Sequence, residues 1–100
     1  MVKHIVFFKL SSQILPENRL SQLKKMVEIF SPLAERLPYI VEFRTGINFT
    51  EAPHSWDFTI DSIFRNKEDL KKYMESKEHL EAIRKGQSIE KTKAVIDYEF

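Results

Sequence analysis

Histidine is the side chain with the broadest chemical use in this sequence, and it occurs three times, at His4, His54 and His79. With a reference pKa of about 6.5, a histidine takes up and releases protons at neutral pH, and its ring nitrogens also bind metals. A three-histidine metal site would require the fold to gather all three residues. Because His54 lies in the polar stretch TEAPHS between two expected strands, we expect no metal site, and proton transfer is the chemistry to consider.

Other reactive groups are scarce. The chain has no cysteine, which excludes disulfides, thiolate metal sites and thiol nucleophiles, and its two glycines cannot form a glycine-rich phosphate loop or a dinucleotide fingerprint. The acidic pairs Asp57 with Asp61 and Asp97 with Glu99 have the spacing of a sheet face, so we expect salt bridges there rather than glycosidase-like acids. The sequence therefore predicts no cofactor.

Length and charge define the class of protein. One hundred residues with 42% hydrophobic and 31% charged side chains indicate one globular domain spanning residues 1–100. The net charge of +1 is spread along the chain, whereas a nucleic-acid-binding protein usually concentrates positive charge on one face. The opening run shows neither a signal peptide nor a membrane span, so we expect a cytoplasmic protein with no nucleic-acid or membrane partner.

The elements that must position the histidines follow from hydrophobic periodicity. Helical spacing, with a break at Pro32, runs from Pro16 to Leu37 through the apolar row Leu20, Leu23, Val27, Phe30, Leu33 and Leu37. Asn66 and Ser76 are expected to cap two further helical segments, NKEDLKKYM and SKEHLEAIRKG. Strand-like alternation occurs in four stretches: MVKHIVFFKL, YIVEFRTGINF, WDFTIDSIF and KAVIDYEF.

This order of elements predicts an α+β, ferredoxin-like βαββαβ fold, in which the helices cover one face of a four-stranded antiparallel sheet. In the first stretch His4 lies on the face expected beneath the helices, while Ile5 and Phe7 point the other way. The expected helix-facing rows are Val2, His4, Val6, Phe8 and Leu10; Val41, Phe43, Thr45, Ile47 and Phe49; Trp56, Phe58, Ile60 and Phe64; and Ala94, Ile96, Tyr98 and Phe100.

The opposite face mixes both signs of charge with large apolar residues. Its expected members are Lys3, Ile5, Phe7, Lys9, Glu42, Arg44, Asp57, Thr59, Asp61, Ile63, Val95, Asp97 and Glu99. A two-fold axis makes such a patch self-complementary, so we predict a homodimer in which two sheets face each other. The alternative is a monomer whose outer face stays wet.

Several stretches together resemble one family. VKHIVFFKL at the start, LPYIVEFRTGINF, WDFTIDSIF followed by DLKKYMESKEH, and VIDYEF at the end are similar to the stress-responsive A/B barrel domain (Dabb) family, over nearly the whole chain. The resemblance implies a dimeric α+β barrel, in which two ferredoxin-like subunits associate through their sheets. Members of this family include plant stress-associated proteins, plant polyketide cyclases and many bacterial proteins with no assigned activity.

The resemblance also implies a site. In the plant cyclases, a histidine of the first strand and a tyrosine and a histidine of the second helical region line a cavity, and motif alignment places His4, Tyr73 and His79 there. A histidine can accept a proton next to a carbonyl while a tyrosine polarises the carbonyl oxygen. On this hypothesis His79 is the base, and Tyr73 and His4 orient the substrate or stabilise the enolate. The other interpretation is that these side chains are ordinary packed core residues.

One motif departs from the family pattern. Many members carry His-Pro-x-His where this chain has Ser76, Lys77, Glu78 and His79, so the first histidine and the proline are missing. Lysine fits the first turn of a helix, so the backbone need not change. Any function that needs the first histidine is in question.

Three functions are therefore open, and the sequence does not decide whether the protein is an enzyme. The first is a homodimeric Dabb domain that binds a small carbonyl or aromatic compound within each subunit and performs cofactor-free acid/base chemistry, as a cyclase or isomerase does. The second is a non-catalytic dimeric binding or stress-associated structural domain. The third, by analogy of fold, is a cofactor-independent monooxygenase.

Overall fold

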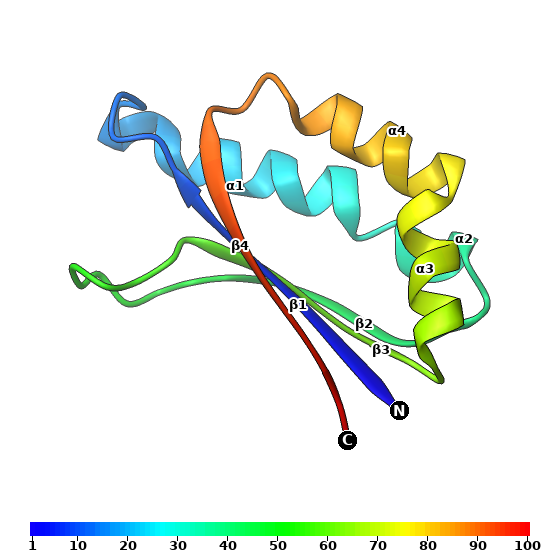
Figure 1. Cartoon of the computed structure of the whole chain (residues 1–100). Helices are drawn as coiled ribbons and strands as arrows, with labels where there is room; N and C mark the ends of the chain where they lie inside the picture. Colours follow the sequence, from blue (N-terminus) through cyan, green and yellow to red (C-terminus); the bar gives the residue numbers. More distant parts are fainter.

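The computed structural model describes residues 1–100 and has the predicted α+β ferredoxin-like architecture (Figure 1). The elements in chain order are β1 (Val2–Leu10), α1 (Pro16–Phe30), α2 (Leu33–Arg36), β2 (Ile40–Ile47), β3 (Phe58–Phe64), α3 (Lys67–Glu75), α4 (Lys77–Gly86) and β4 (Lys91–Glu99). All strand pairs are antiparallel, and the order across the sheet is β2-β3-β1-β4. The first and last strands of the chain are therefore neighbours.

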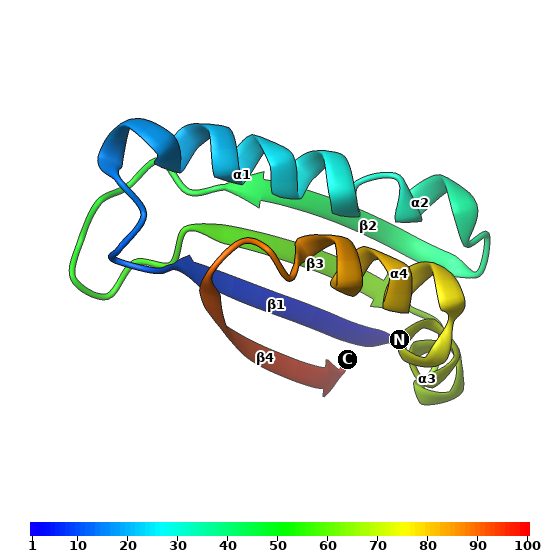
Figure 2. The same ribbon diagram turned by 90° about the horizontal axis from the view of Figure 1, so that it is seen from above.

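The helices all lie on one side of the sheet. Seen from above, α1 runs along β2, α4 runs over the middle of the sheet, and α3 stands at one end (Figure 2). The edge strand β4 has no helix above it in this view. No helix of the chain is both long enough and apolar enough to cross a bilayer.

Local signals set the helix boundaries as predicted. Pro16 is the first residue of α1, and Pro32 separates α1 from α2. The side chain of Asn66 accepts a hydrogen bond from the Asp69 amide at the start of α3. Ser76 ends α3 and caps α4, so one residue forms the corner between these two helices.

The inner rows of β1 and β3 agree with the alternation in the sequence. The even-numbered residues of β1 are buried, as are Phe58, Ile60 and Phe64 of β3. Helix α1 is rotated slightly from the expected face, because Met26 is fully buried whereas Leu20 is 55% exposed. The core lies between the helices and the inner face of the sheet, and α1 contributes Leu23, Met26 and Phe30 to it.

Strand β2 differs from the prediction because it contains a bulge. The pairing with β3 shifts register between Ile40 and Glu42, which turns Ile40 toward the core and leaves Val41 48% exposed. Phe43 and Ile47 pack against the core as expected. Phe49 lies beyond the end of the strand and is 97% exposed, so its expected inward position was wrong.

The two faces of β4 are the reverse of those predicted. His4 of β1, which faces the helices, stands directly opposite Asp97, and Val6 stands opposite Val95. Residues directly opposite each other in an antiparallel pair share a face, so Asp97 and Val95 lie on the helix side and Ile96 lies on the outer side. Both faces of β4 carry charged and apolar residues, so its sequence does not show which face points toward the helices. The pairing register with β1 decides this.

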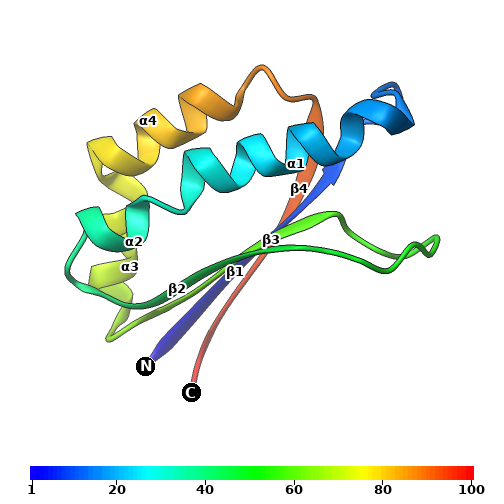
Figure 3. The same cartoon turned by 180° about the vertical axis from the view of Figure 1, so that it is seen from behind.

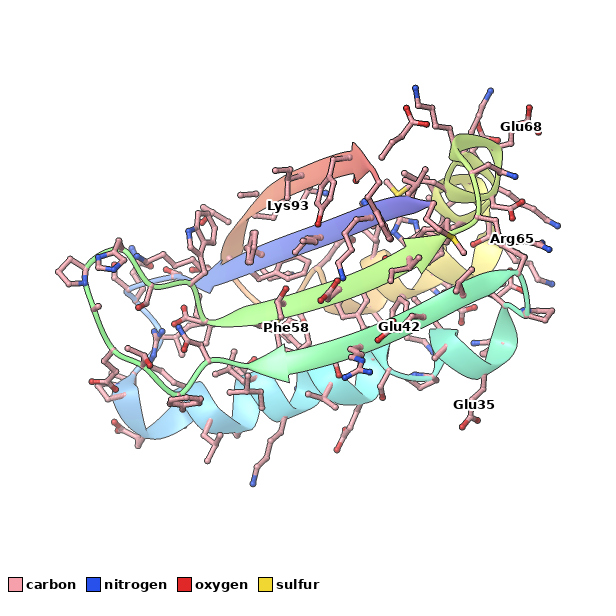
Figure 4. All side chains as sticks on the ribbon, turned by 90° about the horizontal axis from the view of Figure 1, so that it is seen from below. Glu35, Glu42, Phe58, Arg65, Glu68 and Lys93 are labelled. Carbon is pink, nitrogen blue, oxygen red and sulfur yellow. The ribbon has the colours of Figure 1, made fainter.

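The outer face of the sheet is consequently more apolar than the sequence suggested. No helix covers it in the view from below (Figure 4). Pairing across the strands places Ile5 beside Ile96, Phe7 beside Ala94, and Lys3 between Ile63 and Tyr98. Ion pairs flank these residues, between Lys3 and Asp61 at 3.0 Å and between Arg44 and Glu42 at 2.6 Å.

Contacts of Asp57 and of the two chain ends join distant parts of the chain. Asp57 does not join the outer face, because its carboxylate accepts a hydrogen bond from the Leu10 amide at 2.8 Å and pairs with Arg19 at 2.9 Å. The termini lie side by side at one end of the sheet (Figure 3), where the Met1 amino group donates to the Phe100 carbonyl at 3.2 Å. The loop between β2 and β3 extends from the opposite end.

Candidate active site

A cavity of about 260 Å³ lies between the inner faces of β1 and β4 and the helices α3 and α4. His4, Tyr73 and His79 all line it, so the structure brings together the three residues that the family resemblance selected. Each of them is buried, with exposed fractions of 2%, 1% and 7% respectively. Val6, Phe8, Phe30 and Ile60 supply apolar wall.

The corner between α3 and α4 positions Tyr73 and His79. The Ser76 hydroxyl donates to the Tyr73 carbonyl at 2.8 Å and accepts from the His79 amide at 3.1 Å. This double role turns the chain sharply, and α4 begins at Lys77, where many family members have proline. The two rings consequently lie with their centroids 4.5 Å apart, although the residues are six positions apart in the sequence.

His79 is arranged as a neutral base. Its Nδ1 lies 3.1 Å from the carbonyl oxygen of Met74, which can only accept, so Nδ1 carries the proton and Nε2 holds the free electron pair. Burial lowers the pKa of His79, and the nearby His4 and Lys93 lower it further, although the Met74 hydrogen bond partly opposes this. At neutral pH the ring is therefore uncharged and able to accept a proton.

Tyr73 is a buried phenol that can donate a hydrogen bond. Burial raises the pKa of its phenol far above the usual value of about 10, and the neighbouring Tyr39 raises it further. The hydroxyl thus keeps its proton across the physiological pH range. A protonated phenol beside an unprotonated imidazole can donate a hydrogen bond to a ligand oxygen while the imidazole takes a proton.

His4 is held by Asp97, a residue that was expected on the outer face of the sheet. Its Nδ1 hydrogen-bonds to the carboxylate of Asp97, which is directly opposite on β4. The His4 ring also lies 6.0 Å from the Tyr73 ring, between centroids. Asp97 had been assigned to the outer face. The sequence does hold a signal for this contact. If the first and last strands pair antiparallel with their ends aligned, His4 near the N-terminus stands opposite Asp97 near the C-terminus.

His54 does not take part in the site. It is exposed, in the loop that precedes β3. No group of three or more histidine, aspartate or glutamate side chains gathers as metal ligands anywhere in the structure. The titratable side chains that line the cavity are His4, Tyr73, His79, Lys91 and Lys93, and Asp97 acts on it through His4.

The profile of the stress responsive A/B barrel domain family, Dabb, matches residues 2–100. This chain belongs to the Dabb family. A comparison with curated proteins found no match.

Solved structures share the fold of this Dabb chain. A dimeric protein of unknown function with a ferredoxin-like fold from Bacteroides fragilis is 30% identical, with a TM-score of 0.85 over 99% of this chain and 95% of its own. A dimeric ferredoxin-like protein of unknown function from Thermobifida fusca is 15% identical, with a TM-score of 0.81 over 99% of this chain and 90% of its own. Similar structures are thus described as dimers.

An enzyme also appears among the similar structures. A hydroxynitrile lyase from Passiflora edulis is 20% identical to this Dabb chain, with a TM-score of 0.75 over 97% of this chain and 90% of its own. At this identity the likeness shows the fold alone. Any activity must be argued from the residues of this chain.

Proposed function

We propose that this protein is a homodimeric Dabb domain that binds a small carbonyl compound in the cavity of each subunit and transfers a proton next to the carbonyl, without a cofactor. The observation that carries the proposal is the close approach of Tyr73 and His79, 4.5 Å between ring centroids, in the wall of a cavity of about 260 Å³. A cavity of about 150 Å³ holds benzene, so a substituted aromatic ring or a short chain fits this one.

The proposed step uses two side chains in opposite protonation states. The Nε2 atom of His79 takes the proton from the carbon adjacent to the carbonyl, and the hydroxyl of Tyr73 donates a hydrogen bond to the oxygen on which negative charge develops. His4, held by Asp97, lies beside Tyr73 and helps to orient the ligand. Return of the proton to another carbon completes an isomerisation. Alternatively, the enolate carbon attacks a second carbonyl and closes a ring, and the protonated His79 gives its proton to the alkoxide oxygen that forms.

A non-catalytic binding domain is the second candidate, and one observation favours it. Both histidines hydrogen-bond to the protein, His79 to Met74 and His4 to Asp97, as residues with a structural role would. Each of these hydrogen bonds uses only Nδ1, however, so Nε2 of both rings takes no part in them. The open cavity and the free nitrogens support the catalytic proposal over the structural one.

The dimer is proposed to form through the outer face of the sheet. Ile96 and Tyr98 are 51% and 46% exposed in the single chain, and they lie beside Ile5 and Phe7 on a face that no helix covers (Figure 4). Exposed apolar patches of this kind mark interfaces. The dimeric state described for similar structures supports a dimer here, and the exposed apolar face points to the sheet as its interface.

Proton exchange tests the proposed activity directly. Acetophenone in D₂O should exchange its methyl hydrogens faster with the wild-type protein than in buffer, as followed by proton NMR, and His79→Gln should remove the enhancement. His54→Gln, which changes an exposed histidine, is the matched control and should keep it. An exchange rate equal to that in buffer would reject the proposal, and oxygen uptake with a dihydroxyaromatic would point to the monooxygenase instead.

A further inference from the structure

The cavity opens beside the edge strand β4. On this side the lining includes Gln87, just after α4, and Lys91, Thr92 and Lys93 at the start of β4, and we call these four residues the β4 rim. Gln87, Thr92 and Lys93 are exposed. No helix lies above this strand (Figure 2), and Lys93 is exposed on it (Figure 4). Two lysines therefore lie on the β4 side of the cavity, next to solvent.

The charge of this rim is positive and unbalanced. The cavity lining contains Lys91 and Lys93 and no aspartate or glutamate. Neither lysine has a carboxylate partner among the ion pairs of the structure, which involve eight other pairings. Unpaired cations at the mouth of an apolar cavity attract anionic ligands.

Lys91 is held in place by the backbone. Its ammonium donates to the carbonyl oxygens of Gly86, at 2.6 Å, and Ile89, at 3.1 Å, at the end of α4. These two acceptors are neutral, so they fix the position of the charge without cancelling it. An ammonium has three donors, and one remains for a ligand.

The lysines also act on each other and on His79. Burial lowers the pKa of Lys91, and Lys93 lowers it further. Lys93 and His4 lower the pKa of His79 as well, which places the positive charge of Lys93 within electrostatic reach of the proposed base. An anion between the two ammonium groups would relieve both repulsions.

We propose that the natural ligand carries a carboxylate, which pairs with Lys91 and Lys93 at the cavity mouth while its carbonyl lies deeper, beside Tyr73 and His79. This inference rests on the proposed function and names its substrate class as a small oxo acid with an apolar body. The apolar wall at Phe8 and Phe30 accommodates that body, and the two lysines select the charged end.

Paired ligands of equal shape test the inference. 4-Acetylbenzoate and its neutral amide, 4-acetylbenzamide, differ at one group only, and calorimetry measures the affinity of each. The carboxylate should bind about fivefold more tightly than the amide, as an exposed ion pair of about 1 kcal/mol predicts, and this preference should shrink at high salt. Lys93→Gln should reduce the preference, because Lys91 alone then faces the carboxylate, whereas Lys24→Gln, an exposed lysine of α1, should leave it unchanged.

The outcomes separate this inference from the function on which it rests. Equal affinity for the two ligands, or a preference as large in Lys93→Gln as in the wild type, would overturn the carboxylate assignment. If the carboxylate assignment fails but acetophenone exchange still depends on His79, the proposed function stands and only the substrate class is rejected. Absence of binding by both ligands together with absence of exchange would reject both.

Discussion

His4 and Asp97 stand directly opposite each other on β1 and β4, and the Asp97 carboxylate accepts a hydrogen bond from Nδ1 of His4. His4 is almost fully buried, whereas the side chain of Asp97 is about half exposed at 47%. The pair therefore connects the interior of the cavity to the surface at the edge of the sheet. It fixes which ring nitrogen of His4 is left for a ligand.

Asp97→Asn tests whether this pair positions His4. We expect the His79-dependent exchange of acetophenone to fall about tenfold, because a hydrogen bond to a charged group is worth about 1.5–3 kcal/mol. Glu99→Gln, on the same face of β4 and paired only with Lys67, should leave the rate unchanged. Equal rates in wild type and Asp97→Asn would show that the carboxylate does not position the ring.

Ser76→Ala tests the corner that sets Tyr73 beside His79. Loss of this cap should lower the free energy of unfolding by about 1 kcal/mol, and loss of the turn should also impair exchange. Asn66→Ala removes the cap of α3 and should cost a similar amount of stability while leaving exchange intact. Urea unfolding and the exchange assay measure the two effects. Equal exchange in both variants would contradict the role of this corner.

Folding stability should depend on pH through His79. Burial holds its folded pKa below the unfolded value of about 6.5, so the unfolded chain binds a proton more readily between the two values. This contribution is complete above about pH 6.5 and is lost as the pH falls through that interval. Urea unfolding between about pH 7.5 and 5.5 should show the loss, and His79→Gln should reduce it. His54→Gln should keep the wild-type slope; an unchanged slope in His79→Gln would refute the assignment.

Ile96→Lys tests the sheet-to-sheet dimer. A charge at the centre of the outer face should produce a species of 11.9 kDa in light scattering, whereas the wild type should scatter as twice that mass. Leu20→Lys is the matched control, because Leu20 has similar exposure, 55% against 51%, but lies on α1. A dimer that persists in Ile96→Lys would place the interface on another surface.

Much of the fold was predictable because its signals are local. Helix caps at Asn66 and Ser76, and the proline break at Pro32, depend on a few adjacent residues. The inner rows of β1 and of β3 from Phe58 to Phe64 were correctly predicted, since both strands are central and bury a nearly continuous apolar row. Trp56, expected on the same row, instead lies before β3 and beside Phe7 of the outer face. The family resemblance, carried by stretches at both ends and in the middle of the chain, selected His4, Tyr73 and His79, and these three residues line one cavity.

Sequence alone thus determined the order of the elements, the helix boundaries and the central apolar rows of this protein. Only the tertiary structure decided which face of β4 points inward, where β2 is bulged, and that Asp97 joins His4 while Lys91 and Lys93 reach the cavity mouth. Alternation divides a strand into two faces but does not say which is inside when both carry apolar and charged residues. For β4, the hydrogen-bond register with β1 decides which face is inside, and β1 lies at the opposite end of the sequence.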